Sequence, residues 1–368
     1  MADPRITRMA QVLVRYSVAV KPGEPVLIHC TDLAAPLVRE IYREALRAGG
    51  HPEVNAGVPG LAEIFYKEAS EAQLTYVSPM RELAVERYPV HIHIGAPHNV
   101  KELAGVDSRK QAMRSRAMAD LETRFMEKAA RGEIRWVYAE YPTQALAQEA
   151  GMSLAEYEEF LFSACRLDEP DPAAAWQQVA AEQERICRAL EQVDVLRIVA
   201  PDTDLTLRVG GRKWVSADGH YNFPDGEVFT GPVEDSANGH IRFSFPGIYA
   251  GKEIEDIRLT FRDGRVVEAS ARRGEDLLHA LLDSDDGARY LGELGIGTNF
   301  QIQRFTRNML FDEKIGGTIH LAIGAGYPET GSRNKSGVHW DMLCDMRDGG
   351  EIWADGRLIY RAGKFLLD

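Results

Sequence analysis

The order of strand-forming and helix-forming segments constrains this chain most, because that order changes part-way along the sequence. Up to about residue 190, short apolar runs alternate with helical segments, and from Val195 onward strand patterns dominate. Strands that alternate with helices are typical of a parallel sheet covered on both faces. We therefore predict two domains: an N-terminal α/β domain with a largely parallel sheet over residues 1–193, and a strand-rich α+β domain over residues 194–368.

The first half contains an amphipathic first helix and then strands separated by helices. A strand predicted at Pro25–His29 follows a Pro22-Gly23 turn, and the next helix ends at Gly49-Gly50 because glycine readily adopts the left-handed conformation at a helix end. Further strands are predicted at 52–55, 90–94 and 134–139, and helices at 34–48, 108–130, 154–164 and 173–193.

The second half is predicted to be mostly strands with turns such as Asp263-Gly264 between them. The strands are expected at 195–199, 204–209, 240–244, 257–262, 265–271, 318–323 and 351–360, with one helix at 275–282. We find no internal repeat or low-complexity stretch.

Composition argues against several classes of protein. The chain has 368 residues and a formal charge of −13, the opposite of the imbalance expected of a protein that binds nucleic acid. No apolar run reaches the roughly 18–20 residues of a membrane span, and the charged N-terminus does not resemble a secretory peptide. No GxGxxG or GxxxxGK[ST] motif supports nucleotide binding.

The four cysteines indicate a reducing compartment. Cys30, Cys165, Cys187 and Cys344 form no CxxC pair and no regular framework. This spacing argues against a disulfide scaffold and against a thiolate zinc site. We therefore expect a cytoplasmic protein.

Side chains that can bind a metal recur beside glycines or strand ends in the second half. Glu227 follows a turn at Asp225-Gly226, Glu293 lies between glycines, and His320 lies in an apolar strand. Tyr327 and the triplet His339-Trp340-Asp341 come next, so the full set is Glu227, Glu293, His320, Tyr327, His339 and Asp341.

The triplet carries the most local information. In an extended segment residues i and i+2 point the same way, so His339 and Asp341 can reach one ion. Imidazole with carboxylate suits zinc, manganese or cobalt, whereas carboxylates alone suit magnesium better. Three carboxylates and two histidines are enough for two ions about 3.5–4 Å apart.

Each of these residues taken alone also has a simpler explanation. A glutamate beside glycine is usually a solvated turn residue, and a histidine in an apolar strand is usually a core residue. His91 and His93 also alternate on a strand, with His98 nearby. We interpret these three as strand and loop residues, because no carboxylate stands close to them in sequence.

Several motifs in one order resemble the aminopeptidase T and aminopeptidase S family of metallopeptidases. They are PDGEVFTGP at 224–232, LGELGIGTN at 291–299, GTIHLAIGAGYPETG at 317–331 and HWDML at 339–343. In the first half, EYPT at 140–143, AGMS at 150–153 and EYEEFL at 156–161 resemble the signature of that family's N-terminal domain.

The resemblance implies a function and a role for each residue. It implies that Glu227, Glu293, His320, His339 and Asp341 bind two divalent ions, zinc or cobalt, with Glu293 as the bridge. Glu293 and Tyr327 would take part in catalysis. The implied activity is hydrolysis of N-terminal residues from peptides with a free N-terminus by a water that two metals activate, in a homodimer. Only eleven residues, 328–338, separate Tyr327 from His339, fewer than in some relatives.

Two other functions stay open at the level of sequence. Similar ligands serve two-metal phosphoesterases, and Arg333 and Lys335 lie near Tyr327. A non-enzymatic α/β binding protein would use the same polar residues only to close turns. Convergence of the six side chains in space would remove the support for that second alternative.

Overall fold

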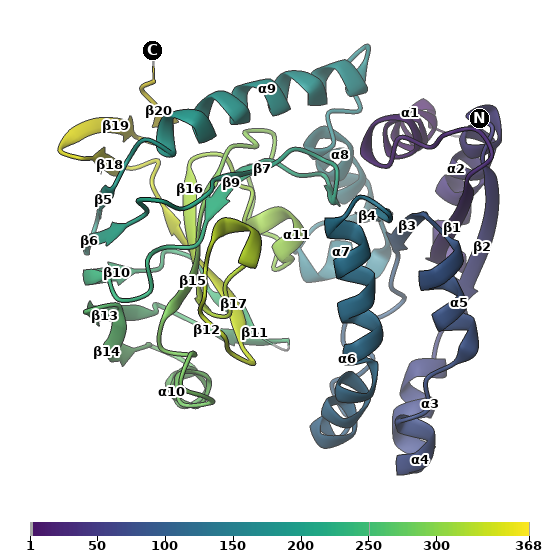
Figure 1. Ribbon diagram of the computed structural model, residues 1–368, viewed down its shortest axis with the longest axis horizontal. Helices are drawn as coiled ribbons and strands as arrows, with labels where there is room; N and C mark the ends of the chain where they lie inside the picture. The colour runs from purple at the N-terminus through teal and green to yellow at the C-terminus, as the bar shows by residue number, and fades with distance from the viewer. Residues whose placement is uncertain (1–2, 250, 368) are drawn as a thin grey trace. The chain divides into compact units, whose positions relative to one another are not determined.

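The chain forms two compact units, and the computed structural model describes residues 3–249 and 251–367 (Figure 1). The first unit comprises the chain up to Ala175 together with Gly219–Pro224. The second comprises Trp176–Asp218 and the chain from Asp225 onward. The boundary expected between residues 193 and 194 falls in the turn before β5, and as a division into domains it stays a prediction.

The first unit is built on a five-stranded parallel sheet in the order β2-β1-β3-β4-β8. Its strands are β1 (Pro25–Thr31), β2 (His51–Gly57), β3 (Val90–Gly95), β4 (Arg135–Glu140) and β8 (Asn222–Phe223). Its helices are α1 (Pro4–Val12), the π-helix η1 (Leu13–Ser17), the 3₁₀ turn η2 (Asp32–Ala34), α2 (Ala35–Arg47), α3 (Leu61–Glu68), α4 (Glu71–Leu74), α5 (Pro79–Arg87), α6 (Ser108–Ala130), α7 (Gln144–Glu149) and α8 (Leu154–Ala164). The predicted parallel α/β architecture is confirmed.

Helical segments cover both faces of this sheet, as two neighbouring residues of β4 show. Successive side chains of a strand point to opposite faces. Arg135 donates to the carbonyl of Val18, directly after η1. Trp136 on the other face contacts Phe125 of α6.

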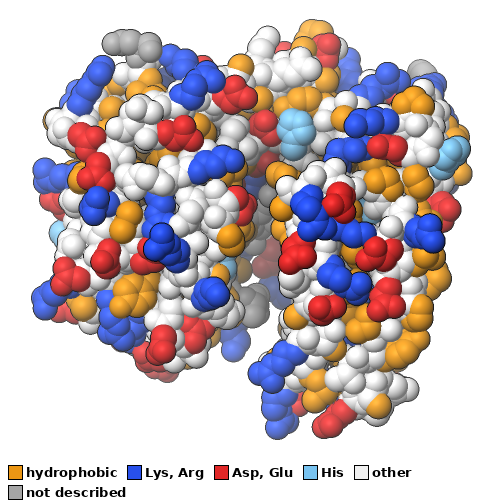
Figure 2. Space-filling model, in the orientation of Figure 1, with side chains coloured by type: hydrophobic (Ala, Val, Ile, Leu, Met, Phe, Trp, Pro, Cys, Tyr) orange, Lys and Arg blue, Asp and Glu red, His pale blue; other side chains and the backbone are white. Residues whose placement is uncertain are grey.

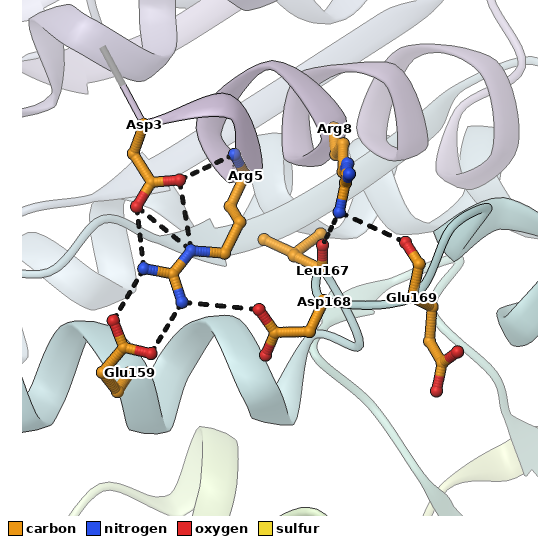
Figure 3. A network of polar contacts seen from close by, with 7 residues as sticks. All are labelled: Asp3, Arg5, Arg8, Glu159, Leu167, Asp168 and Glu169. Atoms are coloured by element: carbon orange, nitrogen blue, oxygen red, sulfur yellow. Dashed lines mark hydrogen bonds and ion pairs between the residues drawn. The ribbon is translucent and has the colours of Figure 1, made fainter. Parts of the chain in front are cut away.

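A charged network ties the first helix to α8 (Figure 3). The Arg5 guanidinium donates to both carboxylate oxygens of Glu159 at 2.7 Å and to Asp3, which caps the N-terminus of α1. Asp168 is a weaker partner at 3.4 Å. Arg5 also lies 4.6 Å from the ring centre of Phe162, so apolar and polar contacts hold α1 and α8 together.

The second unit is mostly antiparallel strands. Helix α9 (Pro172–Leu190) runs from the first unit into it. Its other elements are β5 (Val195–Ala200), β6 (Thr203–Arg208), β7 (Val215–Ala217), β9 (Glu227–Thr230), β10 (Asn238–Arg242), β11 (Gly247–Tyr249), β12 (Lys252–Ile254), β13 (Arg258–Arg262), β14 (Arg265–Ser270), α10 (Glu275–Leu282), β15 (Leu291–Gly297), α11 (Met309–Asp312), β16 (Thr318–Gly324), the 3₁₀ turn η3 (Pro328–Thr330), β17 (His339–Asp345), β18 (Glu351–Ala354), β19 (Arg357–Arg361) and β20 (Lys364–Phe365).

These strands form an eight-stranded sheet, β14-β13-β10-β6-β5-β18-β19-β20, a five-stranded sheet, β17-β16-β15-β9-β7, and the hairpin β11-β12. One core joins the two larger sheets: Leu205 and Ile198 belong to the first, and Leu294 and Leu321 to the second. Since side chains alternate along a strand, the neighbours of Leu294 on β15 and of Leu321 on β16 point to the opposite face of the sheet. That face carries the candidate site.

The surface of each unit mixes charges of both signs on the face shown in Figure 2. None of the helices in the described part of the chain is long and apolar enough to cross a membrane.

Candidate metal centre

Four adjacent strands bring the five predicted ligands onto one face of the five-stranded sheet. Glu227 lies on β9, Glu293 on β15, His320 on β16, and His339 with Asp341 on β17. Across the ladder Glu293 pairs with Ala322, and Ala322 pairs with Asp341, so these side chains share a face. His320 and His339 lie two residues from Ala322 and Asp341 along their strands, and Glu227 pairs with Gly297, four residues from Glu293. All three therefore point the same way.

Small residues between the ligands make this arrangement possible. Gly295 lies opposite His320, and a Cβ atom built there would come within 2.0 Å of Cε1 and 2.1 Å of Nε2 of the imidazole. Any side chain at position 295 would therefore occupy the space of the His320 ring.

The ligand atoms form two groups that share Glu293. Glu227, Glu293 and His320 make one group, and Glu293, His339 and Asp341 make the other. Nε2 of His320 lies 3.2 Å from Oε2 of Glu227 and 3.6 Å from Oε1 of Glu293.

Nε2 of His339 lies 3.3 Å from Oε2 of Glu293 and 3.3 Å from Oδ2 of Asp341. The two oxygens of Glu293 thus face different histidines, as the oxygens of a carboxylate shared between two ions would.

Hydrogen bonding leaves the inward atoms available. Nδ1 of His339 donates to the Ala325 carbonyl at 2.7 Å, which orients the ring so that Nε2 faces the carboxylates. Within the described residues, Oε2 of Glu227 and Oδ1 of Asp341 are buried and accept no hydrogen bond. Buried carboxylate oxygens without donors are costly unless a cation is present.

The carboxylates favour the protonated, positively charged form of both imidazoles. Burial alone would lower the pKa of His320, but Glu227 and Glu293 raise it to about 10. Burial likewise opposes the charge on His339, whose pKa the contacts with Asp341 and Glu293 raise to about 11. Burial raises the pKa of Glu227 well above its usual range. The cluster therefore favours cations, which a pair of metal ions would supply.

Tyr327 lies beside the cluster, after the end of β16. Its ring contacts that of His339 at 5.0 Å between centroids and that of Phe229 at 5.5 Å. The residue is 40 % exposed, so solvent or a substrate can reach it. Partial burial and the carboxylates of Glu293 and Asp341 raise the pKa of the phenol, which stays protonated as a donor.

A buried lysine belongs to the site and was not predicted. Lys314 is fully buried, with Nζ in contact with Glu313, 3.6 Å from Oε1 of Glu227 and 3.9 Å from Oδ1 of Asp225. The only sequence signal is that three charged residues, Asp312, Glu313 and Lys314, directly precede an apolar strand. Such a run usually indicates a solvated turn.

A second connection fixes the segment that carries Glu227. The buried amide of Asn299 donates to the Asp225 carbonyl at 2.9 Å. Gly226 has φ +127°, and a Cβ there would lie 2.6 Å from that of Asn299. The turn before β9 therefore needs glycine for its conformation and for the close approach.

Comparison with known proteins identifies the family. The family described as thermophilic metalloprotease (M29) matches residues 2–365. The chain belongs to the M29 family.

Curated proteins align with this chain over nearly the whole length of both sequences. Aminopeptidase 2 of Geobacillus stearothermophilus is 30 % identical over 100 % of this chain and 98 % of its own. Aminopeptidase AmpS of Bacillus subtilis (strain 168) is 28 % identical over 98 % of each chain. The solved structure of wild-type AmpT from Thermus thermophilus covers 99 % of both chains with a TM-score of 0.87 and 23 % identity, which confirms the fold.

Membership of M29 makes this chain a metal-dependent peptidase, as expected from the motif order. It favours peptide hydrolysis over the two-metal phosphoesterase. Convergence of the five ligand side chains, with Tyr327 against His339, leaves the non-enzymatic binding protein without support.

Proposed function

We propose that this M29 peptidase is an aminopeptidase that uses two divalent metal ions. The relatives that match its whole length are named aminopeptidases. The observation that carries the two-metal proposal is the position of Glu293, whose two oxygens face two different histidines 3.6 and 3.3 Å away.

The donor set fits two ions. Glu227, Glu293 and His320 would hold one, and Glu293, His339 and Asp341 the other. Two imidazoles among three carboxylates suit zinc or cobalt, with manganese and magnesium as weaker candidates. Bound ions of this kind polarise a carbonyl and lower the pKa of water.

The protein's own residues would complete the chemistry. The Tyr327 hydroxyl can donate a hydrogen bond to the oxygen that becomes negative when the peptide carbonyl is attacked. Donors of this type contribute about 10²–10³ in rate. Glu293 would fix the spacing of the two ions. The remaining carboxylates offer a place for the free amine of a peptide, which would explain a requirement for an unblocked N-terminus.

The test combines metal content with hydrolysis of aminoacyl-nitroanilides. We expect two ions per chain in the wild type, loss of hydrolysis on chelation and no action on N-acetylated substrates. Glu293→Gln should abolish turnover and reduce metal content, whereas Glu329→Gln, at an exposed position, should change neither. Wild-type activity in Glu293→Gln, or activity that survives complete metal removal, would contradict the proposal.

We also propose a homodimer. Large apolar side chains are exposed along residues 42–83 of the first unit, in α2, β2, α3, α5 and the segments between them: Tyr42, Leu46, Val54, Val58, Leu61, Ile64, Tyr76, Met80 and Leu83. Strand β2 is also an edge of the parallel sheet. A second copy of the chain would cover this surface. Sedimentation equilibrium should give twice the chain mass, and Leu61→Glu with Met80→Glu should give the monomer.

A cytoplasmic location stays part of the proposal. All four cysteines are free thiols, which is consistent with a reducing compartment.

A further inference from the structure

Three histidines face one another in the first unit, on strands that carry none of the ligands described above. His29 lies on β1, and His91 and His93 lie on β3. His29 pairs with His93 across the ladder, and Leu27 pairs with His91, so the three side chains share one face of the parallel sheet. One ligand nitrogen from each ring lies within 4.8 Å of the other two.

We propose that His29, His91 and His93 bind one divalent transition-metal ion of the zinc type, with a fourth position open to water. This site is separate from the carboxylate cluster around Glu293. Three imidazoles with an open fourth position form a familiar zinc ligand set.

The distance between the first two ligand nitrogens matches such an ion, but the two rings lie head to head and nearly coplanar, with centroids 5.7 Å apart and 6° between planes, so His29 must turn to direct its lone pair at an ion beside His91. Nε2 of His29 lies 3.4 Å from Nδ1 of His91. This separation is long for a hydrogen bond. A tetrahedral zinc with bonds of about 2.0–2.1 Å places two ligand nitrogens about 3.3–3.4 Å apart.

Groups outside the cluster hold His91 in the required tautomer. Its Nε2 lies 3.0 Å from the Tyr88 carbonyl and donates to it, which leaves the Nδ1 lone pair directed at His29. A backbone carbonyl that accepts from the far nitrogen is the usual support of a metal-binding histidine. Burial of His91, which is 3 % exposed, keeps this ring in place.

Asn55 on β2 is placed to support His29 once its amide turns. Its side-chain amide lies 3.4 Å from Nδ1 of His29. When an ion takes the lone pair at Nε2, the proton of His29 moves to Nδ1, and the Asn55 amide turns so that its oxygen accepts it. The number of protons on the cluster is unchanged.

His93 supplies the third ligand after a rotation of its side chain. Its ring stacks on that of His29 at 4.3 Å between centroids and 4° between planes. A ligand lone pair lies in the ring plane, so the ring must turn before it can face an ion shared with its neighbour. His93 is only partly buried and has room at the surface to do so.

The rings are ready to bind because they are neutral at pH 7. Burial and the neighbouring His29 lower the pKa of His91 to about 4, and the same two causes lower that of His93 to about 3. Burial and the Arg81 guanidinium lower the pKa of His29. An ion therefore displaces no proton from His91 or His93 at pH 7.

Selectivity distinguishes this site from the carboxylate cluster. A ligand set of imidazoles favours zinc, cobalt, nickel and copper, whereas magnesium and manganese prefer oxygen. We expect manganese to leave the three histidines unoccupied.

The test compares bound zinc and cobalt in the full-length protein with and without the cluster. After equilibrium dialysis at pH 7.5, His29→Asn and His93→Asn should each hold one zinc fewer per chain than the wild type. Cobalt should give a visible absorption band that these variants lack. His98→Asn, which removes a histidine paired with Asp32 instead, is the control and should match the wild type.

Zinc affinity measured in variants of Asn55 tests the site without removing a ligand. Asn55→Asp should tighten zinc binding about tenfold and Asn55→Leu should weaken it about tenfold, because the partner of a ligating histidine affects affinity by this order. Equal zinc content in the wild type and in His29→Asn, with no effect at position 55, would overturn the proposal and leave a stack of histidines only. Hydrolysis of nitroanilides is not a readout here, so this outcome is independent of the proposed activity.

Discussion

At the scale of single residues, Gly295 decides whether His320 can point at its two carboxylates. A methyl group at this position would overlap the imidazole. We expect Gly295→Ala to displace His320 and to lower metal affinity by about 10–100-fold, the range for lost support of a ligand. Metal titration followed by kcat/KM measurement checks this.

Gly105→Ala is the matched control, since a Cβ there meets no atom within 4 Å and its φ is not in the left-handed region. A Gly295→Ala variant with normal affinity would mean that the strand shifts to make room.

Lys314 is expected to stabilise the fold through the carboxylates around it. Replacement by methionine leaves Glu313 and Glu227 buried without their cation, and removal of one partner from a buried pair costs about 3–5 kcal/mol. We expect a large drop in the urea midpoint of Lys314→Met. The exposed Lys364→Met should stay within about 0.5 kcal/mol of the wild type. Equal midpoints for the two variants would show that Lys314 carries no net stabilisation.

The sequence predicted the residues that converge in the candidate centre better than the residues that support them. Motif order indicated Glu227, Glu293 and His320, and local spacing also indicated His339 and Asp341. The structure brings the five together, and their role as ligands stays a prediction. Lys314 was missed because a charged side chain gives no sign in sequence that it will be buried. Contacts between residues far apart along the chain, such as Asn299 with Asp225, carry no local pattern either.

At the scale of elements, prediction succeeded where burial leaves a periodic pattern. Four of the five strands of the parallel sheet and the helices at 108–130 and 275–282 were predicted close to their observed bounds, whereas the two-residue strand β8 was not predicted. Helix α3 was not predicted, although Leu61, Ile64 and Phe65 recur at helical spacing; none of its residues is buried. Strand β15 was missed because it contains three glycines, which normally disfavour strands but here leave space for neighbouring backbone and side chains.

The contact between α1 and α8 gives a prediction at this scale. Arg5→Met removes the paired bonds to Glu159, and since Glu159 is largely exposed we expect a loss of only about 1 kcal/mol at pH 7. Arg5 lowers the pKa of Asp3 and of Glu159 in the folded chain.

This stabilisation is therefore present above the unfolded pKa values, about 4, and is lost as the pH falls through the lowered folded values. Urea midpoints of the wild type and Arg5→Met should converge as the pH falls below about 4. A double-mutant cycle with Glu159→Gln measures the coupling, and additive single effects at pH 7 would contradict it.

At the scale of the whole molecule, metal ions bound at the carboxylate cluster should stabilise the second unit. A ligand at 100 times its dissociation constant stabilises the folded state by about 2.7 kcal/mol. We expect hydrogen exchange to slow in β9, β15, β16 and β17 when zinc is added to chelated protein. Any zinc-dependent slowing in the first unit should be confined to β1, β3 and their neighbours, around the separate histidine site proposed above.

His320→Asn supplies the control for this measurement, because its second unit should lose most of the zinc-dependent protection. Equal slowing in the second unit of the wild type and of His320→Asn would show that zinc acts elsewhere than at the carboxylate cluster.

The short strand β8 has a consequence for how the two units are inherited. The chain enters the second unit at Trp176, returns to the first for Gly219–Pro224 and leaves again directly before Asp225. The fifth strand of the parallel sheet, β8, is therefore separated from Glu227 by only a few residues. A single recombination event between relatives at the first junction would give the parallel sheet a strand β8 from the other parent. Exchange of a whole unit needs three crossovers, one at each junction between the units, so the two units are expected to share one phylogeny.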